Sequence, residues 1–106
     1  MTMKKILILA AAMALSATAS AADPAAGKEK AKACAVCHGE NGVSQVPDFP
    51  KLAGQHLDYL ARALSDYKSG ARKNAVMAGQ VVNLKREDIA DLAAYYSSLQ
   101  GLTTKY

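Results

Sequence analysis

Two cysteines and a histidine stand close together in the stretch Cys-Ala-Val-Cys-His at residues 34–38. Residues at positions i, i+3 and i+4 are neighbours on the surface of a helix, so Cys34, Cys37 and His38 are expected to face the same object. Two thiols and an imidazole can bind a metal ion, carry out thiol–disulfide exchange, or hold a covalently attached group. The remaining sequence distinguishes among these three kinds of site.

Zinc binding and dithiol chemistry both lack support elsewhere in the chain. A structural zinc site needs four ligands, but the sequence has two cysteines and only one further histidine, His56. A thioredoxin-type redox pair belongs to a βαβ context, and no segment alternates apolar and polar residues as a strand does. Cys-x-x-Cys-His is the pattern for attachment of c-type haem. We therefore expect one covalent haem c with its iron, held by the Cys34 and Cys37 thioethers and by His38 as an axial ligand.

The second axial ligand of the iron is expected to be Met77. It is the only methionine outside residues 1–21 and stands between Val76 and Ala78 in an expected loop, 39 residues after His38. A His/Met ligand pair raises the reduction potential of the iron. His56 could compete, but it starts an expected helix where solvation is the simpler role. An open iron site that binds gases or peroxide is the remaining alternative.

The N-terminal segment has the layout of a secretory signal peptide. Lys4 and Lys5 precede an apolar run at 6–15, and small residues that include Ala19-Ser20-Ala21 follow. The run is only about ten residues long, whereas a membrane-spanning helix needs roughly 20, so a retained membrane anchor is the less favoured alternative. Cleavage after Ala21 would leave one exported domain, residues 22–106, in the periplasm, without an integral membrane segment.

The charge pattern gives little support for nucleic-acid binding. The chain has 13 basic and 9 acidic residues, and removal of Lys4 and Lys5 would reduce the net charge from +4 to +2. The remaining charges alternate in sign, and no Lys/Arg block is interleaved with aromatic residues. The partners of the exported domain are therefore expected to be proteins.

Three main helices and one short helical turn are expected, with no strands. The expected helices are Pro24 to about Val36, about Gln55 to Ser69, and about Arg86 to Leu99. Asp23 should cap the first helix, and Gly70 should end the second. The segment 75–84 is expected to be a loop followed by a short helical turn. Residues 39–55 form a loop that is long for so small a domain, and loops of this length are usually functional or wrapped around something.

With these residues assigned, the chain resembles the class I cytochromes c, and most closely their short bacterial monohaem type, similar to cytochromes c-553 and c4. The resemblance runs from Gly27 to Leu99. Besides the haem motif it is carried by PDFPKLAGQHLDYL at 47–60, DYKSGARKNAVM at 66–77 and DIADLAAYYSSL at 88–99. It implies the all-α cytochrome c fold around one covalent haem.

The resemblance also implies several particular contacts. The first and last helices should cross at Gly27, against which Tyr95 should pack, although helical spacing places Tyr96 on the buried face. A proline carbonyl, best matched by Pro47, should accept a hydrogen bond from the His38 ring. Relatives commonly have a serine cap where Lys85 stands, so Asp88 should supply only half of a capping box.

The function expected from these features is one-electron transfer by a soluble periplasmic carrier that is not an enzyme. The haem should lie in an apolar shell that keeps its potential high, formed by Phe49, Leu52, Leu60, Leu64 and Tyr67. Cationic side chains at Lys51, Arg72 and Lys73 either steer an acidic redox partner or are simply solvated. Donor and acceptor proteins are the expected partners, and they could include membrane respiratory complexes. The alternatives are a haem subunit of a larger dehydrogenase or oxidase complex, and an open-site gas-binding or peroxidase haem protein.

Overall fold

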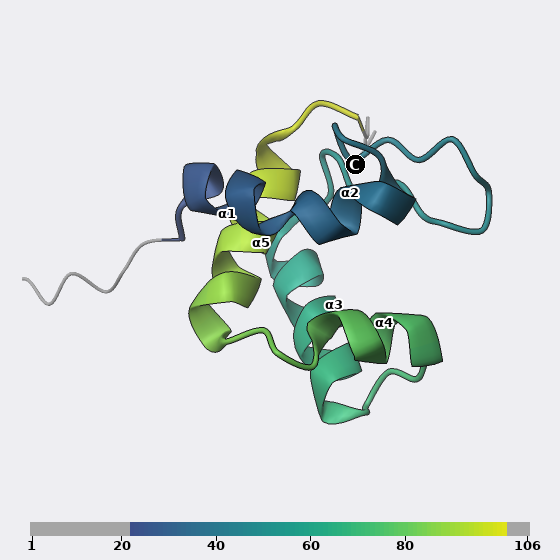
Figure 1. Cartoon of the computed structure of the whole chain (residues 1–106). Coiled ribbons are helices and arrows are strands. Elements are labelled where there is room, and N and C mark those ends of the chain that lie inside the picture. The colour runs from purple at the N-terminus through teal and green to yellow at the C-terminus, as the bar shows by residue number, and fades with distance from the viewer. Residues whose placement is uncertain (1–21, 102–106) are drawn as a thin grey trace, which may run out of the picture.

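The computed structural model describes residues 22–101, which contain five α-helices and no strand. The helices are α1 (Pro24–Lys30), α2 (Lys32–His38), α3 (Leu57–Ser69), α4 (Ala75–Val81) and α5 (Arg86–Ser98). Helix α5 packs against both α1 and α3, and α3 also packs against α4 (Figure 1). The expected all-α fold is confirmed. The expected signal peptide at residues 1–21 lies outside the described residues.

The first expected helix is divided at Ala31 into α1 and α2. Asp23 caps α1 as expected, since its carboxylate accepts a hydrogen bond of 2.9 Å from the Ala25 N–H. Ala31 has a ψ of −1°, which interrupts regular helix geometry, yet the Ala35 N–H still bonds to the Ala31 carbonyl at 2.9 Å. Helix α2 also continues past Val36 and ends at Gly39, where φ is +85°. The cysteine–histidine motif therefore lies wholly within a helix.

Helices α1 and α5 cross in direct backbone contact at Gly27. A Cβ atom added to Gly27 would lie 2.0 Å from the Asp91 carbonyl oxygen and 2.7 Å from the Tyr95 Cβ atom. The expected contact between Gly27 and Tyr95 is thus confirmed. Tyr95 and Tyr96 are both buried, with exposed fractions of 8% and 4%. Tyr95 packs at the crossing, and the expected burial of Tyr96 is also confirmed.

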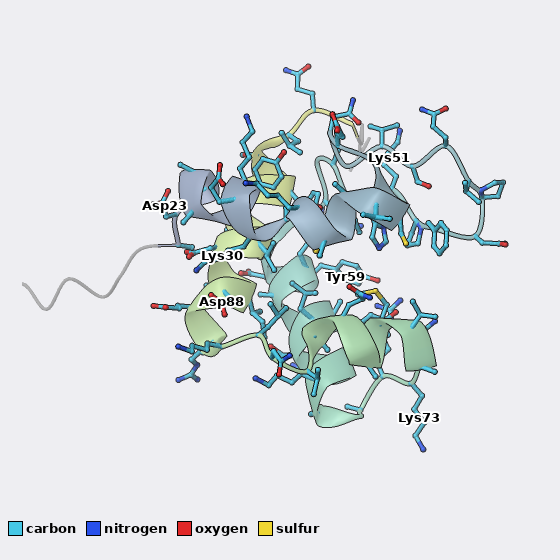
Figure 2. The ribbon with its side chains drawn as sticks, in the orientation of Figure 1. Asp23, Lys30, Lys51, Tyr59, Lys73 and Asp88 are labelled. Atoms are coloured by element: carbon cyan, nitrogen blue, oxygen red, sulfur yellow. The ribbon has the colours of Figure 1, made fainter. Side chains whose placement is uncertain are left out.

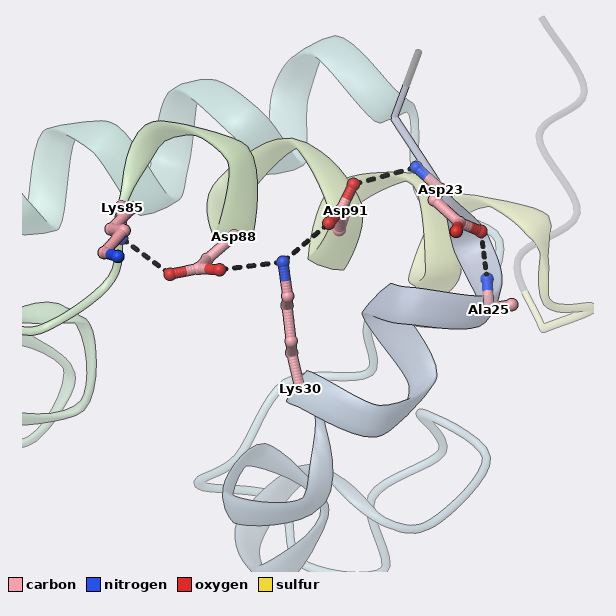
Figure 3. Close-up of polar contacts among 6 residues, drawn as sticks. All are labelled: Asp23, Ala25, Lys30, Lys85, Asp88 and Asp91. Atoms are coloured by element: carbon pink, nitrogen blue, oxygen red, sulfur yellow. Dashed lines mark hydrogen bonds and ion pairs between the residues drawn. The ribbon is translucent and has the colours of Figure 1, made fainter. Parts of the chain in front are cut away.

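A group of charged side chains fastens α1 to the first turns of α5 (Figure 3). The Lys30 ammonium lies 2.8 Å from a carboxylate oxygen of Asp88 and 2.7 Å from one of Asp91. Asp91 also accepts a hydrogen bond of 2.8 Å from the Asp23 N–H. Asp88 accepts one of 2.8 Å from the Lys85 N–H, which is the half capping box expected from the sequence. These contacts hold the first helix against the beginning of the last one.

Segment 75–84 differs from the expected loop and short turn. Helix α4 begins immediately at Ala75, because the Asn74 side chain caps it by accepting a hydrogen bond of 3.0 Å from the Met77 N–H. Met77 is therefore the third residue of a helix and does not lie in a loop. Gly70, with φ of +87°, ends α3 in the left-handed conformation, as expected.

The loop between α2 and α3 has no regular structure from Gly39 to His56, as expected. Its two ends are tied together, since the Gly42 carbonyl accepts hydrogen bonds from the N–H groups of Leu52 and Ala53 at 2.9 and 3.1 Å. The Gly54 N–H then bonds to the Tyr96 carbonyl at 2.9 Å, which attaches the loop to α5. The loop is thus positioned to form one wall of the space next to α2.

Candidate cofactor site

A cavity of about 280 Å³ lies among α2, the loop after it, α3, α4 and α5. This volume is near the lower end of the range typical of small-molecule sites. Nine of the side chains predicted to form the site line this cavity: Cys34, Cys37, His38, Phe49, Leu52, Leu60, Leu64, Tyr67 and Met77. Residues from four separate elements therefore meet at one place. Pro47 is exposed and does not line the cavity.

Both cysteines of the motif face the cavity from α2. Both side chains are partly buried, and Cys34 packs against the hydrophobic core. Burial raises the pKa of the Cys34 thiol above its usual value, because an apolar environment disfavours the thiolate. The Cys37 carbonyl accepts a hydrogen bond of 3.4 Å from Ser44, at the start of the loop.

His38 is buried, and its ring is held in one orientation. The Nδ1 atom lies 2.8 Å from the Pro50 carbonyl oxygen. Since a carbonyl can only accept, Nδ1 is the donor and carries a proton. The Phe49 ring stands edge-on to the imidazole, with ring centroids 6.4 Å apart. This is the arrangement typical of metal-binding histidines, in which the second nitrogen is fixed by a hydrogen bond.

The prediction that the Pro47 carbonyl accepts the hydrogen bond from His38 is wrong, because the Pro50 carbonyl accepts it. The backbone turns between Val46 and Phe49, where the Phe49 N–H bonds to the Val46 carbonyl at 3.1 Å. Pro47 lies within this turn and is exposed. Pro50 follows the turn, where the chain comes back towards α2.

Met77 and His56, the two candidates for the second iron ligand, lie in different environments. Met77 is partly buried and lines the cavity from α4. His56 is exposed, precedes α3, and is not part of the cavity lining. Within residues 22–101 no cluster of three or more His, Cys, Asp or Glu side chains could hold a metal ion by itself.

Several lining residues were not part of the predicted haem shell, although Arg72 was expected as a cation that could steer a redox partner. Tyr59 (labelled in Figure 2) lines the cavity from α3, and Arg72 lines it from the segment after α3. The Arg72 guanidinium donates a hydrogen bond of 3.2 Å to the Tyr59 hydroxyl and lies 4.8 Å from the centre of the Tyr67 ring. The hydrogen bond to Tyr59 raises the pKa of Arg72 above its ordinary value. Tyr59, Ala63 and Tyr67 step by four, and this spacing could have predicted a second lining stripe on α3.

Tyr96 also lines the cavity. The sequence predicted that Tyr96 is buried, but it did not predict that Tyr96 belongs to the site. Tyr96 reaches the cavity from α5, together with Leu92. Lys51, Asn74 and Gln80 add polar groups at other points of the lining. The cavity is thus mostly apolar, with two cations, Lys51 and Arg72, and one carboxylate, Asp48.

The cytochrome c family model matches residues 24–100 of the chain. The sequence is 46% identical over 98 residues to cytochrome c4 of Pseudomonas aeruginosa, a match that covers 91% of this chain and 49% of the relative. It is 44% identical over 81 residues to cytochrome c-554(548) of Halomonas halodenitrificans, which covers 74% of this chain and 98% of the relative.

The fold is also similar to a solved cytochrome structure. The crystal structure of reduced recombinant cytochrome c4 from Pseudomonas stutzeri matches with a TM-score of 0.73 and 42% sequence identity, over 77% of this chain and 48% of that one. The chain therefore spans about half the length of the cytochrome c4 relatives and nearly the whole length of the cytochrome c-554(548).

Proposed function

The chain belongs to the cytochrome c family, and we propose that it is an electron carrier that transfers one electron at a time through a single covalently bound haem c. Haem c with its iron is the cofactor of a cytochrome c domain. The proposal rests on one observation: one largely apolar cavity is lined by Cys34, Cys37, His38 and Met77.

The residues around the cavity fit a haem. The macrocycle is a flat, largely apolar group, and most of the lining is aliphatic or aromatic. Haem also carries two carboxylates, and Lys51 and Arg72 bring positive charge to the lining. When bound, haem c supplies an iron that alternates between the ferric and ferrous states.

The two cysteines would attach the cofactor. Each thiol would add across one vinyl group, with the sulfur bonding to one carbon and the hydrogen going to the other, so that no oxidant would be needed. Cys34 and Cys37 are three residues apart on α2 and share one side of the helix. Their position at the cavity supports a thioether at each.

His38 and Met77 would bind the iron from α2 and α4. The Pro50 carbonyl holds a proton of His38 on Nδ1, which would leave Nε2 to bind the iron and would make it a stronger donor. Met77 contributes a soft thioether sulfur, which favours ferrous iron and raises the potential. Phe49, Leu52, Leu60, Leu64 and Tyr67 would exclude water, which further disfavours the more highly charged ferric state.

We place the carrier in the periplasm, with donor and acceptor redox proteins as its partners. In residues 1–22, two lysines are followed by an apolar run and then by small residues, and this order supports export. No helix within residues 22–101 combines the length and the apolar character needed to cross a membrane. Arg72 and Lys73 are exposed and could speed encounters with an acidic partner.

A potentiometric titration of the purified protein, followed through the visible absorption of the haem, tests the proposed function. We expect one reversible transition with the slope of a single electron, and slow or absent binding of CO to the reduced protein. A high-spin ferric spectrum with rapid CO binding would instead support the open-site alternative and contradict the electron-carrier proposal.

A further inference from the structure

The Tyr96 hydroxyl is a buried polar group without a partner in the described chain. Tyr96 is only 4% exposed, and its hydroxyl forms no hydrogen bond with any residue from 22 to 101. The hydroxyls of two other tyrosines do have partners. Tyr95 donates to the Glu40 carbonyl at 3.3 Å, and Tyr59 accepts from Arg72. Buried hydroxyls are nearly always hydrogen-bonded, so the Tyr96 hydroxyl needs an acceptor that completes the site.

The Cys34 sulfur is a candidate acceptor for this hydroxyl. Tyr96 and Cys34 line the same cavity, and Cys34 packs against the core cluster that contains Tyr96. Burial raises the pKa of the Tyr96 phenol, and the neighbouring Cys34 side chain raises it further. The phenol therefore keeps its proton at physiological pH and can act as a hydrogen-bond donor.

We propose that Tyr96 is a positioning residue whose hydroxyl donates a hydrogen bond to the Cys34 sulfur when that sulfur is the thioether that holds haem c. The inference rests on the proposed function, because it requires covalent haem at Cys34. A thioether sulfur is a weak acceptor, so the bond should be weaker than one to a carbonyl oxygen. The bond would join α5 to α2 at the edge of the cofactor.

The hydrogen bond would have two effects. It withdraws electron density from a sulfur bonded to the macrocycle and points the positive end of the O–H dipole at the cofactor, and both favour the reduced state. It also satisfies a hydroxyl that would otherwise be buried without a partner, so it stabilises the haem-loaded fold. The same tyrosine would thus raise the reduction potential and the stability of the holoprotein.

Substitution Tyr96→Phe in the full haem-loaded chain tests the inference, with Tyr95→Phe as the matched control. Both variants remove one hydroxyl from neighbouring buried tyrosines on α5. We expect Tyr96→Phe to lower the reduction potential and the unfolding midpoint in urea. Tyr95→Phe should lower the midpoint through loss of the Glu40 contact and leave the potential at the wild-type value.

Two results for Tyr96→Phe would overturn the inference: a potential equal to that of wild type, or an unfolding midpoint that rises because the hydroxyl had no partner. If this variant does not fold, resonance Raman spectra of the reduced wild-type protein decide. A shift of the carbon–sulfur stretching band on transfer to D₂O is expected, and an unshifted band would contradict the bond. Wild-type protein without covalent haem would instead contradict the proposed function, and the two failures are therefore distinguishable.

Discussion

Met77 is the single side chain with the clearest expected effect on the iron. In Met77→Ala the haem should remain attached, because Cys34, Cys37 and His38 are intact. The potential should fall, since a ligand that favours ferrous iron is lost, and the reduced protein should bind about one CO per haem. Absorption spectra with and without CO would measure both changes.

The matched control for Met77→Ala is His56→Ala, which removes the exposed competing ligand. It should leave the spectrum, the potential and the CO reactivity at wild-type values. If His56→Ala opens the iron and Met77→Ala does not, the proposed ligand assignment is wrong.

At the scale of residues, those parts of the site could be predicted whose residues lie close together in the sequence at helical spacing. The Cys-x-x-Cys-His motif and the apolar stripe with Leu60 and Leu64 depend only on helix periodicity. Pro50 could not be chosen over Pro47, because the path of the loop is fixed by contacts to Gly42 and α5, which are distant in sequence. Tyr96 was placed on the buried face by periodicity, but nothing local indicated that its hydroxyl would lack a partner.

At the scale of elements, the crossing of α1 and α5 requires a residue without a side chain at position 27. Gly27→Ala should destabilise the protein by about 3 kcal/mol or more, the upper range for overpacking, because its Cβ would meet the Asp91 backbone at 2.0 Å. Gly79→Ala is the matched control, since a Cβ there meets nothing within 4 Å. It should stabilise α4 by about 0.5–1 kcal/mol. Urea unfolding would measure both, and equal effects would contradict the close crossing.

The charged contacts between α1 and α5 should make stability depend on pH. Hydrogen bonding to Lys30 lowers the pKa of Asp88, and the Asp23 N–H together with Lys30 lowers that of Asp91. A depressed carboxyl pKa contributes stability above the unfolded value of about 3.9. That contribution is lost as the pH falls through the lower pKa of the folded protein.

Substitution Lys30→Met tests this electrostatic contribution. The unfolding temperature of the variant should be below that of wild type at pH 7, and the difference should shrink as the pH falls below about 4. Lys32→Met is the control, because its ion pair with Glu29 is largely exposed and should contribute little. A difference between Lys30→Met and wild type that stays constant with pH would contradict this role of the network.

The helices themselves were predictable to different degrees. Asp23, Gly70 and the apolar face of α5 are local signals, and each was confirmed. The interruption at Ala31 was not predictable, because alanine is the strongest helix former and the break occurs where the chain is buried in the core. Helix α4 was missed although Asn74 is a good N-cap, because the segment after it is short and has weak periodicity.

At the scale of the whole molecule, the described chain has too small a core to explain its fold by side-chain packing alone. The largest side chains that are fully buried are Leu92 of α5 and Val81 of α4. Several apolar residues of α3 instead face the cavity. Small domains bury a limited core, and chains of up to about 80 residues often gain stability from a metal or disulfide. We infer that the haem completes the core of this domain, as metals do in small metal-dependent folds.

The double variant Cys34→Ala/Cys37→Ala should therefore contain little helix. Far-UV circular dichroism of this haem-free chain should show mostly disordered backbone, whereas the wild-type holoprotein should show the helix content of α1–α5. A haem-free variant with wild-type helicity and cooperative unfolding would show that the polypeptide assembles without the cofactor.

The intact mass of the denatured wild-type protein tests the central claim most directly, since denaturation releases any haem that is not covalently bound. We predict a mass equal to one polypeptide plus one haem, with neither Cys34 nor Cys37 able to react with a thiol reagent. A mass equal to the polypeptide alone, with two reactive thiols in a protein that is still compact before denaturation, would contradict the claim.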